Sequence, residues 1–100
     1  MGSSKKAQYQ AYQLKYALTA KALGHAARIA IVEYLSQNYA ATNNDLRKLV
    51  KLNGATVYQH FDVLMEAGII QEDFFFDKHY YYMNHQAKLQ FIDVLNVFQS

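Results

Sequence analysis

The sequence predicts a mainly α-helical fold with one small β-hairpin, in the order α-α-α-α-β-β-α. Three observations lead to this prediction. Apolar residues recur at helical spacing along most of the chain, the period becomes strand-like after Gly68, and helix breakers are scarce, with four Gly and no Pro. Because 100 residues can build only one modest core, we expect a single domain over residues 1–100.

Two helices are predicted in the first part of the chain. Residues 5–22 carry one apolar stripe, formed by Tyr9, Tyr12, Tyr16, Ala20 and Leu23. After Gly24, residues 26–37 resume the helical pattern with Ile29, Val32 and Leu35 on one face. Residues 1–6 are weakly basic and expected to be disordered, and residues 38–41 are expected to form a loop.

Two further helices are predicted between residues 42 and 67. Thr42 is a good N-cap and Asp45 stands three residues on, a weaker version of the capping box. Asn53 can cap a second helix that runs through Ala67, and Gly68 can end that helix in the left-handed conformation. The connection between the two helices is too short for an antiparallel pair, so we expect them to cross.

The final part of the chain changes period twice. Residues 69–84 are rich in β-formers on both sides of Asp77 and Lys78, which predicts a hairpin with its tip near residues 75–78. Residues 86–98 return to helical spacing, with apolar positions at Leu89, Ile92, Leu95 and Phe98.

Residues 42–67 therefore have the pattern of a helix-turn-helix. Its second helix, called the recognition helix, can enter the major groove of DNA. A hairpin directly after that helix, over residues 69–84, can act as a wing that reaches phosphates or the minor groove. Three segments resemble the ArsR-type winged helix-turn-helix regulators, namely Lys21–Val32, Thr56–Ile70 and His79–Asn84. The resemblance extends over roughly residues 10–98.

The resemblance implies a homodimer that represses transcription by occupying an operator in double-stranded DNA. The first and last helices would hold the dimer together, with residues 86–98 as the dimerisation helix. The expected interface consists of Tyr9, Tyr12, Tyr16, Ile92, Leu95 and Phe98. Large aromatic faces on terminal helices are what a short chain would bury on dimerising.

Candidate DNA contacts follow from the side chains around the helix-turn-helix and the hairpin. Gln59 can pair with adenine, Thr56 can contact a thymine methyl group, and Tyr58 can donate to a phosphate. The full predicted set is Arg47, Lys48, Lys51, Thr56, Tyr58, Gln59, His60 and Lys78. For His60, a structural hydrogen bond in a semi-buried position is favoured over a catalytic role.

One feature departs from the resembled family. No Lys or Arg occurs between Lys51 and Lys78, and the net charge of the chain is only +2. Because neutralised phosphates supply much of DNA affinity, this predicts weak binding by the recognition helix itself. The alternative function is a winged-helix protein-interaction module that has lost DNA binding, with Phe74, Phe75 and Phe76 as partner contacts. A wing folded back on its own helix would explain these aromatic residues equally well.

Other chemistries find little support in the sequence. The absence of cysteine excludes a disulfide or thiolate metal site within this chain. We expect no catalytic residues, cofactor or metal, although a zinc site of His85 and Asp93 across a dimer is conceivable. A metal-binding role for His79 and His85 is disfavoured, and His25 is expected in a capping region. No signal peptide or transmembrane run is visible, so a cytoplasmic location is expected, and a small-molecule effector is left open.

Overall fold

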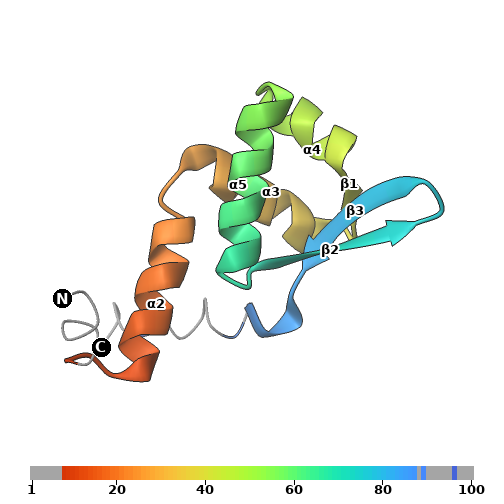
Figure 1. The fold of residues 1–100 in the computed structure, drawn as a ribbon. Coiled ribbons are helices and arrows are strands. Elements are labelled where there is room, and N and C mark those ends of the chain that lie inside the picture. The colour runs from red at the N-terminus through yellow and green to blue at the C-terminus, as the bar shows by residue number, and fades with distance from the viewer. Residues whose placement is uncertain (1–7, 88, 90–95, 97–100) are drawn as a thin grey trace.

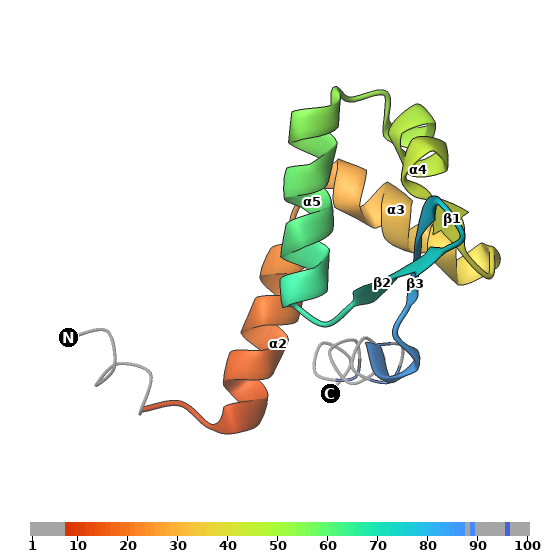
Figure 2. The same ribbon diagram turned by 45° about the vertical axis from the view of Figure 1, so that its right-hand side comes forward.

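The computed structural model describes residues 8–87, Leu89 and Asn96. Helices α3, α4 and α5 form a compact body with a small sheet, and α2 extends away from that body (Figures 1 and 2). The elements are α2 Ala11–Ala22, α3 Ala26–Gln37, β1 Ala41–Thr42, α4 Asn43–Val50, α5 Gly54–Glu66, β2 Ile70–Phe75 and β3 Lys78–Met83. This is the predicted fold class, mainly helical with a β-hairpin after the fourth helix.

The predicted helix caps are confirmed by their hydrogen bonds. Thr42 Oγ1 accepts from the Asp45 amide at 3.1 Å, and the Asp45 carboxylate accepts from the Thr42 amide at 3.1 Å. Asn53 Oδ1 accepts from the Thr56 amide at 2.9 Å and so begins α5. Gly68 has a φ of +74°, as expected for a glycine that follows a helix end.

The sheet has one strand more than the hairpin predicted from the sequence. Its order is β1-β3-β2, and all pairs are antiparallel. The added strand, Ala41–Thr42, pairs with Tyr80 and Tyr81, so the expectation that Ala41 lies in a loop was wrong. A strand of two residues is too short to show an alternation of apolar and polar side chains in the sequence. Only its pairing with β3 defines it as a strand.

The core lies between α3, α4, α5 and the inner face of the sheet. Val57, Phe61 and Leu64 of α5 are fully buried, as predicted, and the Phe61 and Tyr81 rings lie 4.4 Å apart. The predicted inner face of α3 was partly wrong, because Ile29 is exposed and Ile31 is buried in its place with Leu35. Strand alternation turns Ile70 and Tyr81 inward and leaves the neighbouring positions on the outer face.

Several expectations concern the two ends of the chain. Tyr9 and Tyr12 are more than half exposed, Tyr16 is half-buried, and Leu14 and Leu18 on the same segment are also exposed. Residues 85–87 are helical, in keeping with a last helix that begins near residue 86. The expected disorder of residues 1–6 and the interface residues Ile92, Leu95 and Phe98 lie outside the described residues.

Candidate nucleic-acid interface

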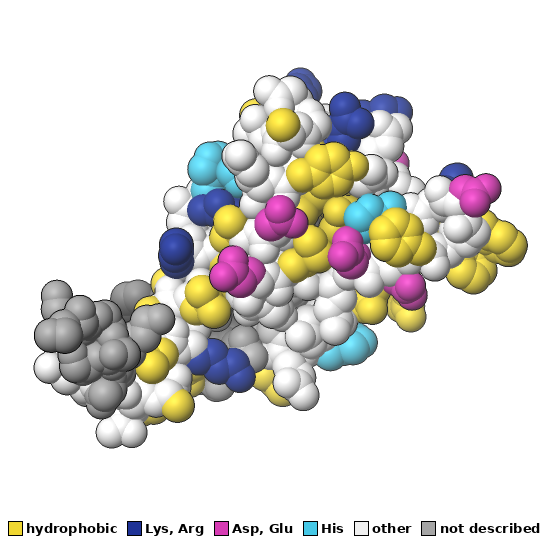
Figure 3. Space-filling model, viewed as in Figure 1, with side chains coloured by type: hydrophobic (Ala, Val, Ile, Leu, Met, Phe, Trp, Pro, Cys, Tyr) yellow, Lys and Arg dark blue, Asp and Glu magenta, His cyan; other side chains and the backbone are white. Residues whose placement is uncertain are grey.

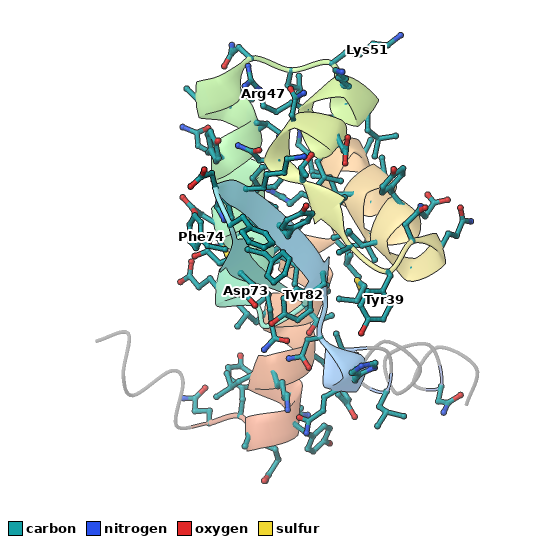
Figure 4. The ribbon with its side chains drawn as sticks, turned by 90° about the vertical axis from the view of Figure 1, so that its right-hand side faces the viewer. Tyr39, Arg47, Lys51, Asp73, Phe74 and Tyr82 are labelled. Atoms are coloured by element: carbon teal, nitrogen blue, oxygen red, sulfur yellow. The ribbon has the colours of Figure 1, made fainter. Side chains whose placement is uncertain are left out.

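Three cations surround the turn between α4 and α5. Arg47 and Lys48 lie in the last turn of α4, and Lys51 forms its C-cap with a left-handed φ of +56°. The Arg47 side chain lies over the start of α5, because its Cζ and Nη2 atoms are 3.8 Å from the position that a Cβ would take at Gly54. Figure 4 shows Arg47 and Lys51 together at this end of the molecule. The positive charge of these three side chains is thus next to the N-terminus of α5, the recognition helix. The backbone amides at that N-terminus also favour an anion.

The exposed side of α5 presents short polar and aromatic side chains. Ala55, Tyr58, Gln59 and Asp62 are exposed, and Thr56 is half-buried. Gln59 is therefore available to a ligand on this side, as the sequence predicted. Its amide offers both a donor and an acceptor, the combination that pairs with an adenine edge.

Tyr58 is exposed but already has partners within the chain. Its hydroxyl accepts a hydrogen bond from the Asn43 side-chain amide at 2.6 Å, and its ring packs edge-on against Phe61 at 5.6 Å. These contacts link the first turn of α4 to α5 and fix the ring. The hydroxyl hydrogen remains available as a donor. Sequence reasoning did not single out Asn43, because its partner is 15 residues away and no local pattern joins them.

His60 does not belong to the exposed face on which a DNA contact would lie, so its assignment to the DNA-contacting set was wrong. Its side chain is buried, with 8% of the residue exposed. Arg28 Nη1 donates to His60 Nδ1 at 3.3 Å, which leaves the imidazole proton on Nε2. The alternative of a structural hydrogen bond is the one found. Burial, followed by the neighbouring His25 and Arg28, lowers the pKa of His60 below its ordinary value.

Arg28 joins three elements through the same guanidinium group. Besides contacting His60 in α5, its Nε donates to the Ala22 carbonyl at the end of α2 at 2.7 Å. His25 caps α3, as expected, because its Nδ1 accepts from the Ala27 amide at 3.0 Å. The Lys21–Val32 segment singled out in the sequence therefore contains the residues that hold α2, α3 and α5 together.

The wing projects from the body of the molecule (Figure 1). Phe74, Phe75 and Phe76 are all exposed, and Phe76 at the tip is 88% exposed with a left-handed φ of +54°. A wing folded back on its own helix would have buried these rings, so that alternative was wrong. Lys78 is exposed beside the tip and begins β3, so it belongs to the wing and not to the α4–α5 turn.

The inner-facing row of the wing also carries a polar contact. His79 Nε2 donates to the Glu72 carboxylate at 2.6 Å, and the His79 ring stacks on Phe74 at 4.3 Å. This contact belongs to the wing itself, since the register places Phe74 opposite His79. It gives His79 a structural partner within the wing.

Basic and acidic side chains are unevenly distributed over the face in Figure 3. Cations gather over α4 and the start of α5, at the top of the view in Figure 3. Acidic side chains lie lower, over the C-terminal half of α5 and the wing, at the exposed residues Asp62, Glu66, Glu72, Asp73 and Asp77. A polyanion would therefore be attracted at the α4–α5 end and repelled over the lower half of α5.

Comparison with known proteins shows that the helix-turn-helix and the wing are similar to those of DNA-binding domains. Residues 25–71 match the family model described as winged helix-turn-helix DNA-binding. This segment runs from the cap of α3 through α4 and α5 to the start of β2. The comparison with curated protein sequences gives no match.

Solved structures extend the similarity over nearly the whole chain. An ArsR family transcriptional regulator superposes with a TM-score of 0.77 at 19% identity, covering 91% of this chain and 93% of its own. The transcriptional repressor BigR from Xylella fastidiosa gives a TM-score of 0.66 at 22% identity, with 82% and 83% coverage. A homodimeric winged helix-turn-helix DNA-binding domain from Mycobacterium bovis gives 0.70 at 20% identity, with 85% and 79% coverage.

The resemblance to ArsR-type winged helix-turn-helix regulators is thus confirmed at the level of the fold. The family model is of a DNA-binding domain, and the first two of these solved structures are of transcriptional regulators. No helix within the described residues has the length and apolar character needed to span a membrane. No three His, Asp or Glu side chains converge as metal ligands in the part of the chain that the structure describes, and Asp93 lies outside it.

Proposed function

We propose that this chain is a dimeric, sequence-specific DNA-binding transcription regulator, which acts as a repressor and uses no cysteine metal site. The observation that carries the proposal is the α4–α5 turn. There the capped helix α5 begins next to the Arg47 guanidinium, and the exposed Lys48 and Lys51 lie at the end of the preceding helix. The match of residues 25–71 to a DNA-binding family model supports the same function.

The side chains of this turn divide by the part of DNA that they can contact. Arg47, Lys48 and Lys51 would hold phosphates, and Lys78 would contact the backbone from the wing. Gln59 and Thr56 would read base edges in the major groove. Tyr58, whose ring is fixed by Asn43 and Phe61, would donate its hydroxyl hydrogen to a phosphate or a base.

Dimerisation compensates for the absence of cations in α5. Two copies present two cationic turns, so the number of neutralised phosphates doubles at one operator. The apolar residues exposed on α2 and just before it, among them Tyr9, Tyr12 and Leu18, supply a surface that a second copy can bury. The homodimeric state of the Mycobacterium bovis domain and the repressor role of BigR support this part of the proposal.

The experiment is a selection from random duplexes with purified protein at low salt, repeated with variants. Gln59→Ala should lose base preference at one or two positions in each half-site, a discrimination of about 1–3 kcal/mol. Lys48→Ala is the matched control, since it should weaken binding to all duplexes about equally and leave the preferred bases unchanged. Equal loss of preference in both variants would contradict the assignment of Gln59.

A second function is favoured by the wing. Three exposed phenylalanines lie among Glu72, Asp73 and Asp77, a surface that fits a basic and apolar protein partner better than a polyanion. On this reading the chain is a winged-helix protein-interaction module without DNA binding. A partner captured from cell extract by the wild type but not by Phe75→Ala, with DNA binding absent at low salt, would favour it over the first proposal.

A further inference from the structure

We infer that a groove on the outer face of the wing binds a small organic cation with an apolar body. This groove, called the wing groove below, lies between the segment 36–40 and the strands β2 and β3, and its volume is about 710 Å³. Pockets for small ligands commonly have volumes of about 300–1,000 Å³. The side chains that line it include Tyr39, Asp73, Phe75, Tyr80 and Tyr82.

Strand alternation builds the aromatic wall of the wing groove. Ile70 of β2 and Tyr81 of β3 are buried against the body of the molecule. The neighbouring positions along each strand therefore face the opposite way. Asp73 stands directly opposite Tyr80 in the register, and Phe75 lies two residues beyond Asp73 on the same face. The rings of Phe75, Tyr80 and Tyr82 and the carboxylate of Asp73 therefore share the outer face of the sheet.

The segment before β1 forms the second wall. Tyr39 is 100% exposed and lines the groove from this side, while Tyr82 lines it from β3 (Figure 4). The pairing of β1 with β3 holds this segment beside the sheet. An exposed aromatic ring opposite a wall of further rings is an arrangement that can close around a ligand.

The charge and chemistry of the lining select a cation. The aromatic faces of Tyr39, Tyr80 and Tyr82 attract a quaternary or protonated amine, and Asp73 adds a negative charge beside them. Asp73 makes no ion pair within the described residues. Its Oδ1 accepts a hydrogen bond from the Phe74 amide at 2.8 Å. Among the described residues, no Lys or Arg lines the groove, and Lys78 on the same face stands at the tip end.

The same lining argues against other occupants. A phosphate or a DNA backbone would meet the Asp73 carboxylate, with no Lys or Arg beside it among the described lining residues. A purely apolar ligand would leave that carboxylate unpaired beside it. An organic cation satisfies both the rings and the carboxylate.

The position of the wing groove gives it a regulatory consequence, which rests on the proposed function. Its two walls belong to the wing and to the segment that leads through β1 into α4. A ligand that contacts both walls fixes the wing relative to the helix-turn-helix. Occupancy then changes operator affinity only if the wing contacts DNA.

The test measures binding to the intact protein without DNA, so its failure is separate from a failure of DNA binding. Choline and its neutral isostere 3,3-dimethylbutan-1-ol are titrated at pH 8, and chemical shifts of the tyrosine rings are followed by NMR. We expect choline to shift the Tyr80 and Tyr82 rings and to bind about fivefold more tightly than the alcohol. Asp73→Asn should remove this preference, and Tyr39→Ala should weaken choline binding by a similar factor.

Two exposed wing residues outside the groove supply matched controls. Asp77→Asn makes the same change of charge as Asp73→Asn, and Phe76→Ala removes an exposed ring as Tyr39→Ala does. Both controls should leave choline affinity within about twofold of the wild type. Equal affinity for choline and the alcohol, shifts confined to other residues, or an equal loss in Asp77→Asn would each overturn the proposal.

Discussion

At the scale of single residues, His60 carries the clearest link between burial and stability. Its neutral ring accepts a hydrogen bond from Arg28 and is surrounded by protein on the buried side of α5. The lowered pKa means that the folded protein binds this proton less readily than the unfolded chain, whose His pKa is about 6.5. The stability contributed by His60 is therefore complete above that unfolded pKa and is lost as pH falls below it.

The prediction is that the free energy of unfolding decreases between about pH 7 and about pH 5, and that His60→Gln flattens part of this decrease. Urea unfolding at a series of pH values measures it. His85→Gln is the control, because His85 is exposed. The same pH dependence in the wild type and in His60→Gln would show that another group is responsible.

Residue identities also mark the limit of what the sequence could predict. Thr42, Asn53 and Gly68 act through neighbours within a few residues, so their roles were readable from spacing. The Asn43–Tyr58 and Arg28–His60 pairs join residues 15 and 32 positions apart. Long-range pairs of this kind leave no local pattern, which is why Asn43 was missed and His60 was assigned to DNA.

At the scale of elements, the recognition helix depends on its cap. Asn53→Ala removes the side-chain acceptor of the Thr56 amide and should destabilise the protein by about 1 kcal/mol. Asn53→Asp should retain most of that stability, because a carboxylate is an equally good N-cap. Urea unfolding compares these variants with Asn44→Ala, an exposed position in the first turn of α4. A loss of stability in Asn44→Ala as large as that in Asn53→Ala would show that the cap has no special contribution.

The wing tip contains an unfavourable backbone conformation. Phe76 has a φ of +54°, a region that Asn tolerates far better than Phe. Phe76→Asn should therefore stabilise the protein by about 0.5–1 kcal/mol, measured as an increase in the free energy of unfolding. Phe75→Asn, which removes an exposed ring from the extended strand β2, should give no such gain. A stabilisation common to both variants would point to the loss of an exposed ring instead.

The sequence predicted these elements with unequal success. The helices and the hairpin were readable because each carries several apolar positions at one period. The strand β1 is only two residues long and is defined by its partner β3. The buried face of α3 differs from the predicted one, with Ile31 inward and Ile29 outward, because the apolar residues of this helix are spread over more than one face.

At the scale of the whole molecule, the exposed apolar side chains of α2 predict self-association. Leu18→Glu places a charge on this surface and should shift the protein from dimer to monomer at micromolar concentration. Light scattering measures the mass, and circular dichroism verifies that the helices are retained. Gln13→Glu adds the same charge at an exposed polar position of α2 and should remain dimeric. A monomeric wild type, or a dimeric Leu18→Glu variant, would contradict this interface.

In the function that we propose, the cationic α4–α5 turn delivers α5 to operator DNA. The most direct measurement is a salt titration of binding to the duplex enriched by selection and to a shuffled duplex. We expect a preference for the enriched duplex, with half-sites about 34 Å apart, and a linear fall of log affinity with log salt. Replacing Lys51 by Ala should lower that slope by about one per protomer bound. Equal, salt-insensitive binding to both duplexes, or no enriched sequence at low salt, would contradict it.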